Sequence, residues 1–361
     1  MAPVTNPIPV VWSPETRLHD PRHEVWVGVP TDGTEVPARV DAILDAMGDR
    51  PRVEAAPHDD ALLLGVHDEE LLTWLRTAHE RWMAGPYDEL VGQQRVVPYF
   101  FPTPALSQGM PMHRPAAVHG EAGRFCYDTM TLVGPGTWPA ARAAVDAALT
   151  AVDLVAAGAR AAYALCRPPG HHVTRAGYGG SCYLNNAAMA AQALRDAGHE
   201  RVGVLDVDAH HGNGTQAIFW ERPDVAYASL HVDPGAGWFP HVFGYADERG
   251  AGAGADTTRN EPLPEGTGDD VWSVTAAGLV DWLSGLGCTA LVVSLGVDAA
   301  ADDPESPLQV TADGYRSAGA AVGATGLPTV AVQEGGYHLE TLGPLVDAFL
   351  DGLAGPGETR G

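Results

Sequence analysis

The chain has 361 residues, and its composition is ordinary except for its charge. Twenty-one lysine and arginine residues stand against 46 aspartate and glutamate residues, and the resulting net charge of −25 argues against binding to nucleic acid or to an acidic membrane surface. The four cysteines form no C-x-x-C pair, so neither a disulfide framework nor a thiolate zinc site is expected. The N-terminal stretch lacks the pattern of a signal peptide, and no apolar run approaches the roughly 20 residues of a membrane span, so we expect a cytoplasmic protein.

The first third of the chain is less regular than the rest. Apolar residues at helical spacing predict helices at 37–47 and 68–84. Between 86 and 118 the sequence is rich in proline, carries aromatic residues and has no clear periodicity. We expect one domain spanning 1–361, in which residues from about 86 to 130 form a long loop insertion at the rim of an active site or at the interface of a homodimer.

From about residue 140 onward, strand-like apolar runs alternate with alanine-rich helical stretches. The predicted strands are 161–165, 202–207, 225–231, 290–295 and 328–332. The predicted helices are 140–157, 185–198, 214–221, 269–286 and 311–325. This alternation is typical of an α/β fold in which a mostly parallel sheet is covered by helices on both faces.

The most informative motif is Asp-Val-Asp-Ala-His-His-Gly-Asn-Gly at 206–214, directly after a buried strand. Along an extended chain, the side chains of Asp206, Asp208 and His210 would point to the same face. One such residue at a strand end could simply cap the next helix. Three ionisable groups together would carry a large desolvation cost unless a cation paired with them, so the motif favours a divalent-metal site.

A second strand end offers the missing ligand. Asp298 follows the apolar run 290–295 and a glycine, and it can lie beside Asp208 and His210. Alone it would be interpreted as a helix cap, but two carboxylates and one imidazole together leave zinc an open position for water. The same ligands could also hold Fe²⁺ or Co²⁺.

Two further loops carry groups suited to acid–base chemistry. His171 and His172 follow a stiff Pro-Pro-Gly turn, and beside a metal they become candidates for general base and general acid. Asp206 and Asn213 would orient them and, as one carboxylate and one neutral amide, would give them different proton affinities. Tyr337, after two glycines, could donate to a carbonyl oxygen as negative charge develops there. Together these groups predict metal-assisted hydrolysis of an amide by an activated water molecule.

Four ordered motifs identify the family that the chain resembles. Arg-Pro-Pro-Gly-His-His, Asp-Val-Asp-Ala-His-His-Gly-Asn-Gly, Ser-Leu-Gly-Val-Asp and Glu-Gly-Gly-Tyr resemble those of the histone deacetylase superfamily over nearly the whole chain. The segments 182–192, 239–241, 244–248 and 252–255 are most similar to the bacterial acetylpolyamine amidohydrolases. The resemblance implies a three-layer α/β/α arginase/deacetylase-like fold and a zinc-dependent deacetylase.

The resemblance also implies roles for individual residues, and these agree with the roles inferred above. The zinc ligands fall on Asp208, His210 and Asp298, the paired histidines on His171 and His172, and the tyrosine that stabilises the transition state on Tyr337. The family's structural K⁺ falls on a further set, some of which contribute main-chain carbonyls: Asp206, Asp208, His210, Ser229 and Leu230.

The substrate channel is where this chain departs from the family pattern. Phe239 matches one of the two aromatic residues that usually line the channel, but Ser181, after Gly180, stands where the other is expected. We therefore expect a wider and wetter channel on that side. Glu121 and Asp128 are the candidates for contacting a substrate amine.

These observations predict a deacetylase acting on acetylpolyamines or similar small cationic N-acylated amines. An alternative is an amidase for a bulkier natural-product amide or an acetyl-lysine peptide, because Ser181 would enlarge the channel. A non-catalytic binding protein is disfavoured because every expected catalytic residue is present. A manganese ureohydrolase of the arginase type would need a carboxylate-rich cluster for two metals, which the motifs do not supply.

Overall fold

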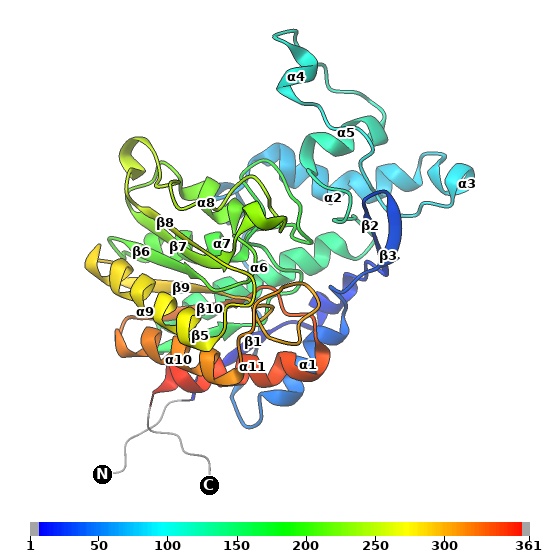
Figure 1. The fold of residues 1–361 in the computed structure, drawn as a ribbon. Coiled ribbons are helices and arrows are strands. Elements are labelled where there is room, and N and C mark those ends of the chain that lie inside the picture. The colour runs from blue at the N-terminus through cyan, green and yellow to red at the C-terminus, as the bar shows by residue number, and fades with distance from the viewer. Residues whose placement is uncertain (1–6, 356–361) are drawn as a thin grey trace, which may run out of the picture.

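The computed structural model describes residues 7–355, whose centre is an eight-stranded sheet (Figure 1). All neighbouring strands in this sheet run parallel, in the order β4-β1-β5-β10-β9-β6-β7-β8. The strands are β1 (Val10–Trp12), β4 (Arg52–Glu54), β5 (Ala161–Ala164), β6 (Val202–Asp206), β7 (Val225–Val232), β8 (Thr258–Leu263), β9 (Ala290–Leu295) and β10 (Thr329–Gln333). A separate antiparallel hairpin joins β2 (His23–Trp26) to β3 (Val29–Asp32).

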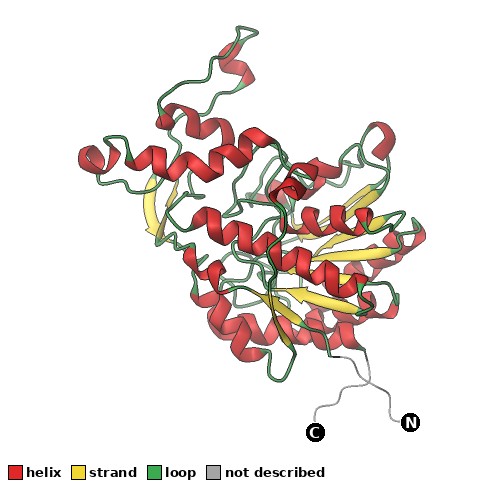
Figure 2. Ribbon diagram, turned by 180° about the vertical axis from the view of Figure 1, so that it is seen from behind, coloured by secondary structure: helices red, strands yellow, loops and turns green. Residues whose placement is uncertain are grey.

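Helices cover both faces of the sheet and complete three layers (Figure 2). One face is covered by α1 (Ala38–Ala46), α9 (Asp269–Gly285), α10 (Ala312–Ala324) and α11 (Leu339–Ala354). The other is covered mainly by α2 (Glu69–Met83), α6 (Thr137–Ala156) and α7 (Asn186–Asp196). The shorter helices are α3 (Tyr87–Val91), α4 (Pro104–Ser107), α5 (Val118–Phe125) and α8 (Asn213–Phe219).

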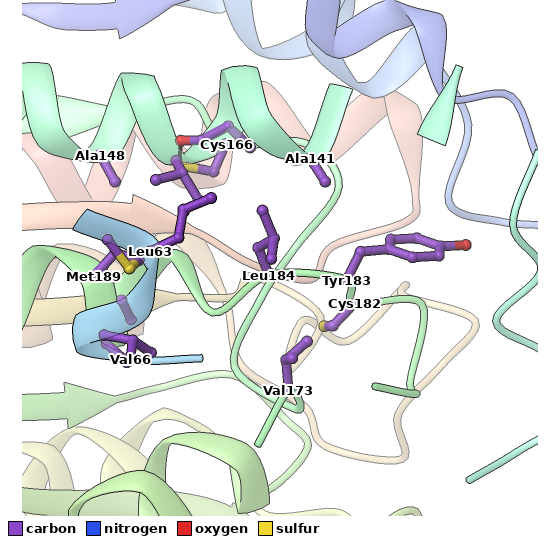
Figure 3. Close-up of a cluster of buried hydrophobic side chains, with 14 of the residues drawn as sticks. Leu63, Val66, Ala141, Ala148, Cys166, Val173, Cys182, Tyr183, Leu184 and Met189 are labelled. Carbon is purple, nitrogen blue, oxygen red and sulfur yellow. Dashed lines mark hydrogen bonds between the residues drawn. The ribbon is translucent and has the colours of Figure 1, made fainter. Parts of the chain in front are cut away.

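Alternation along the central strands explains why two helical layers are needed. In β9, Val292 packs into the core on one face of the sheet, whereas Leu291 and Val293 pack into the core on the other. Every residue of β5, β6, β7, β9 and β10 is buried, as expected for parallel strands covered on both sides. Figure 3 shows part of the first core, where Leu63, Leu184 and Met189 meet side chains from α6.

The predicted three-layer fold is confirmed, and each of the five predicted strands and seven predicted helices has a counterpart in the structure. Three strands of the sheet were missed: β1 and β4 have only three residues each, and β8 is a polar edge strand that contains Pro262. The helix α11 was also missed: its apolar residues follow a helical spacing, but Pro344 lies within it and disfavours a helix interior. Tertiary packing against α10 and α1 stabilises that helix.

The proline-rich segment contains α3 and α4 and leads into α5. The part around α4 projects from the body as an arm (Figure 1), whereas α5 packs into the core through Val118, Ala122 and Phe125. Within residues 7–355, none of the helices combines the length and the apolar character that crossing a membrane requires. The first six residues lie outside the described part, and the N-terminal stretch used to predict the location falls mostly there.

Candidate active site

The site lies where four adjacent strands end. Since β5, β10, β9 and β6 are consecutive neighbours and run parallel, their carboxyl ends meet at one edge of the sheet. The loop after β5 carries His171 and His172, the loop after β6 carries Asp208 and His210, and the loops after β9 and β10 carry Asp298 and Tyr337. Parallel topology thus brings together residues that are more than 160 positions apart in the sequence.

Asp208, His210 and Asp298 form a group with the geometry of a metal site. One potential ligand atom from each residue lies within 4.8 Å of the other two. The Nδ1 atom of His210 is 3.0 Å from Oδ2 of Asp298 and 3.2 Å from Oδ1 of Asp208. Burial and the charge of Asp208 raise the pKa of Asp298 to about 7, as expected when two buried carboxylates share one site.

Two glycines make room for these carboxylates. A Cβ atom on Gly296 would lie 2.1 Å from Oδ2 of Asp208, and one on Gly335 would lie 2.4 Å from Oδ2 of Asp298. The N–H of Gly335 also donates to Oδ2 of Asp208 at 2.8 Å. The close backbone approach, the converging oxygen and nitrogen donors and the mutual repulsion of the carboxylates fit a bound divalent cation.

His171 is paired with a carboxylate. Its Nδ1 atom is 3.0 Å from Oδ2 of Asp206, which also accepts a hydrogen bond from the hydroxyl of Tyr227 at 3.1 Å. Burial by itself would lower the pKa of His171, but Asp208 and Asp206 outweigh that effect and raise it to about 10. Without a metal, His171 therefore carries a proton on both ring nitrogens at neutral pH.

His172 is paired with a neutral amide. Its Nδ1 atom is 2.7 Å from Oδ1 of Asn213, and its ring lies 4.1 Å from that of His171, measured between centroids. Burial, together with the positive charges of His171 and His210, lowers the pKa of His172 well below its usual value. If its Nδ1–H donates to Asn213, its Nε2 lone pair remains available to accept a proton.

Tyr337 is held by residues that the sequence patterns did not reveal. Its backbone N–H donates to Oδ2 of Asp303 at 2.6 Å. Arg39, from α1, donates to the carbonyls of Gly336 at 2.7 Å and Glu334 at 2.6 Å, and its guanidinium lies 4.8 Å from the centroid of the Tyr337 ring. Burial raises the pKa of Tyr337 well above its usual value, so its phenol stays protonated. The only sequence signal for Arg39 would have been a charged residue on the buried side of a short helix.

The predicted channel residues Phe239 and Gly180 lie against His172. The ring of Phe239 packs edge-to-face on the imidazole, with centroids 4.7 Å apart and planes at 87°. A Cβ atom on Gly180 would lie 2.3 Å from Cδ2 of His172 and 2.9 Å from the Phe239 ring. Gly180 has a φ of +57°, and Ser181 has a φ of +59°, so the chain turns sharply beside His172.

The two acidic residues predicted to contact a substrate amine have other partners. Glu121 is fully buried, 2.5 Å from Arg81 at its nearest approach, and also paired with Arg114. Asp128 accepts hydrogen bonds from the backbone of Gly180 and from three groups of the neighbouring loop. We correct both assignments: Glu121 pairs with Arg81 of α2 and with Arg114 of the insertion, and Asp128 shapes the turn at Gly180.

Two further acidic residues, Glu24 and Glu305, interact through their charges. Glu24 lies on β2, where burial together with the charge of Glu305 raises its pKa to about 8. Glu305 accepts a hydrogen bond from the hydroxyl of Thr34 at 2.8 Å, and its backbone N–H donates to Asp303. These carboxylates come from a hairpin and a loop far apart in the sequence, so no motif could have linked them.

The residues assigned to K⁺ lie on two paired strands and the loop that follows. Asp206, at the end of β6, is directly opposite Ser229 in β7, and Leu230 follows in the same strand. The loop after β6 is fixed on β7 by a hydrogen bond from Val232 N–H to the carbonyl of Ala209 at 2.9 Å. The structure thus brings the predicted potassium residues close together, next to the metal-ligand loop.

Comparison with known proteins places this site in a family. The family model for the histone deacetylase domain matches residues 33–353. The chain is 41% identical over 349 residues to the acetylpolyamine amidohydrolase of Mycoplana ramosa, covering 96% of this chain and 99% of that protein. It is 43% identical over 343 residues to the acetylpolyamine amidohydrolase of Burkholderia pseudomallei, covering 94% and 97% of the two chains. The crystal structure of an acetylpolyamine aminohydrolase from Burkholderia pseudomallei superposes with a TM-score of 0.88 at 40% identity, covering 96% of this chain and 99% of that one. The chain therefore belongs to the histone deacetylase family.

Proposed function

We propose that this deacetylase is a zinc-dependent amidohydrolase that removes acetyl groups from acetylpolyamines or similar small cationic amines. The observation that carries the proposal is the convergence, at one sheet edge, of three potential metal-ligating side chains with two differently paired histidines and a half-buried tyrosine. The names of the relatives at 41% and 43% identity support the substrate class. The mixed oxygen and nitrogen donors of Asp208, His210 and Asp298 suit Zn²⁺ with an open position.

The roles of the protein groups follow from their protonation. A divalent cation bound to the three ligands would polarise the amide carbonyl and favour deprotonation of water. His172, neutral and hydrogen-bonded to Asn213, accepts the proton of the attacking water, and His171, whose Nδ1 atom is paired with Asp206, is placed to supply a proton toward the leaving nitrogen. The protonated phenol of Tyr337 donates to the carbonyl oxygen as it becomes negative.

Charge supports a cationic substrate. Burial and the charge of Glu305 raise the pKa of Glu24 to about 8, and a substrate ammonium group beside Glu24 would offset that repulsion. We assign to Glu24 and Glu305 the role that the sequence assigned to Glu121 and Asp128. The net charge of −25 adds a long-range attraction for amines, which salt screens over about 8 Å at physiological ionic strength.

The proposal includes a second, structural ion. We place K⁺ at the junction of β6 and β7, where Asp206 and Ser229 pair, because main-chain and side-chain oxygens suit such an ion.

The proposal also covers the compartment and the oligomeric state. The four cysteines are free and buried, which suits a reducing cytoplasm. We also propose a single domain that forms a homodimer through segment 86–130, whose arm exposes Tyr99, Leu106, Met110 and Met112.

The proposal is tested by measuring turnover of N-acyl substrates by zinc-loaded protein. The panel contains acetylputrescine, acetylcadaverine, acetylspermidine, an acetyl-lysine peptide and a bulky aryl amide. We expect preference for the acetylated diamines, loss of activity with a chelator and recovery with zinc.

Tyr337→Phe should lower kcat about 100-fold or more while zinc binding is retained, because only the donor to the developing oxyanion is removed.

Two outcomes would contradict the proposal in different ways. Preference for the peptide or the aryl amide would replace the substrate class and leave the deacetylase chemistry intact. Undiminished turnover in Tyr337→Phe, or in Asp298→Ala at equal zinc supply, would show that the assigned residues do not carry the reaction.

A further inference from the structure

Ser181 leaves a gap in the aromatic lining that the sequence predicts for the channel. Its backbone N–H donates to Thr131 Oγ1 at 2.9 Å, and its φ of +59° continues the turn that begins at Gly180. Phe239 is then the only channel aromatic that the sequence had assigned. A single aromatic wall would hold an aliphatic chain weakly, because half of its surface would remain in water.

The ring of Tyr127 lies in this gap. A Cβ atom on Gly179 would lie 2.3 Å from Cε2 and 2.5 Å from Cζ of Tyr127, so this ring packs directly on the backbone that precedes Ser181. The Tyr127 ring is nearly parallel to that of Phe239, with an interplanar angle of 13° and centroids 6.3 Å apart. Its side chain is partly open to solvent, with 39% of the residue exposed.

Both rings are also fixed to the same catalytic residue. The hydroxyl of Tyr127 donates to the carbonyl of His172 at 2.7 Å, while Phe239 packs on the His172 ring. The backbone N–H of Tyr127 donates to the carbonyl of Tyr178 at 3.1 Å, which anchors its position independently of the side chain. Tyr127 is therefore held beside His172 rather than free on the surface.

We propose that Tyr127 forms the second aromatic wall of the substrate channel, in place of residue 181, and thereby selects slender unbranched amine chains. The proposal rests on the proposed amidohydrolase function of the same site. Carbon atoms in contact lie about 3.5–4 Å apart, so a methylene chain between two rings needs them about 7–8 Å apart. The present 6.3 Å spacing requires only a small outward movement for such a chain and leaves no room for a bulky one. The expectation of a wide, wet channel is thus replaced by that of a narrow slot.

The test compares Tyr127→Ala with Tyr127→Phe. For acetylputrescine or acetylcadaverine, Tyr127→Ala should raise KM about tenfold with a smaller change in kcat, because the lost ring contact mainly binds the chain. In the same variant, kcat/KM for the bulky aryl amide should rise relative to kcat/KM for the acetylated diamine. Tyr127→Phe keeps the ring and should restore KM to within about twofold of wild type. Val274→Ala, which truncates an exposed side chain on α9, is the control.

Two results would overturn the proposal. Equal loss of kcat in Tyr127→Ala and Tyr127→Phe would mean that the hydroxyl positions His172 and that the ring is not a wall. If Tyr127→Ala leaves unchanged both the KM for the acetylated diamine and the preference for the diamine over the aryl amide, Tyr127 has no role in the channel. If Tyr127→Ala fails to fold by circular dichroism, Tyr127→Leu takes its place, because it keeps apolar volume without an aromatic face.

A second readout separates this proposal from the proposed function. Binding of acetylputrescine to metal-free protein is followed by NMR titration in wild type, Tyr127→Ala and Tyr127→Phe. Weaker binding in the alanine variant alone supports the wall even if the wild-type protein hydrolyses none of the panel. Equal binding in all three variants contradicts the wall even if turnover is high.

Discussion

His171 and His172 are neighbours in the chain but have chemically different partners. Asp206 stabilises the charged form of His171, whereas Asn213 offers His172 only a neutral oxygen. The sequence predicted this difference because both partners belong to the motif at 206–214. It could not predict the size of the effect, since burial and the charges of Asp208 and His210 act through space.

His67 shows how burial of a single histidine couples folding to pH. Its Nδ1–H donates to the carbonyl of Thr174 at 3.1 Å, and its Nε2 accepts the backbone N–H of Asn185 at 3.0 Å, a pairing that only the neutral ring can make. Burial and the nearby Arg175 lower the pKa of His67 from 6.5 to about 4. The unfolded chain therefore binds a proton before the folded chain does as the pH falls.

We expect the free energy of unfolding to decrease between pH 6.5 and pH 4, with His67 contributing up to about 3 kcal/mol of that loss. Above pH 6.5 its contribution is complete. His67→Gln should be less stable at pH 7.5 but should lose less stability on acidification. Urea unfolding of metal-free protein at several pH values measures this, with the exposed His113→Gln as control. If the free energy of unfolding depends on pH in the same way for wild type and His67→Gln, His67 does not couple folding to pH.

At the scale of secondary structure elements, the loop after β10 depends on a helix from the other end of the chain. α1 reaches this loop through Arg39, whose guanidinium is also ion-paired with Glu35 at 2.8 Å and fully buried. The carbonyls of Glu334 and Gly336 accept its hydrogen bonds, so the position of Tyr337 follows that of α1. Arg39 acts through Tyr337 and is a positioning residue.

Arg39→Lys retains the charge but loses the planar fork that reaches two carbonyls. We expect kcat to fall about 10- to 100-fold with little change in KM, because small displacements of a catalytic group are costly. Arg50→Lys is the matched control: Arg50 is also buried and pairs with α11 through Asp347, away from the Tyr337 loop. Equal effects of both substitutions on melting temperature and kcat would indicate a general loss of stability instead.

At the scale of the whole molecule, the arm around α4 projects from the compact three-layer body (Figure 1). Its surface includes a groove of about 860 Å³ lined by Phe100, Leu106 and Met112 among others. Leu106 and Met112 are 53% and 57% exposed. Exposed apolar side chains gathered on one projecting segment favour burial against another protein surface, and a second copy of the chain would place two such arms together.

We expect the wild-type protein to have a solution mass near twice its chain mass of 37.8 kDa. The double substitution Leu106→Glu and Met112→Glu should shift it to the monomer, because charges would be buried at the interface. Light scattering after size-exclusion chromatography measures both. Val274→Glu, at a 73% exposed position of α9, should leave the mass unchanged. A monomeric wild-type protein, or a dimer that survives the double substitution, would contradict the proposed interface.

The sequence by itself determined the central strands and the active-site motifs. A long apolar run indicates a strand that is buried on both faces, and the ionisable residues that bound it indicate where the strand ends. Both are local properties of the chain. Asp208, His210, Asp298, His171, His172 and Tyr337 were accessible for this reason, since each lies in a short motif at such a strand end.

Only the tertiary structure decided which groups surround those motifs. Arg39, Glu24 and Tyr127 reach the site from a helix, a hairpin and the end of the insertion, and nothing in their local sequence indicates the contact. Glu121 was placed wrongly for the same reason, because its arginine partners come from two different segments, α2 and the folded insertion. Through-space contacts between distant segments depend on packing, and a local pattern carries no information about them.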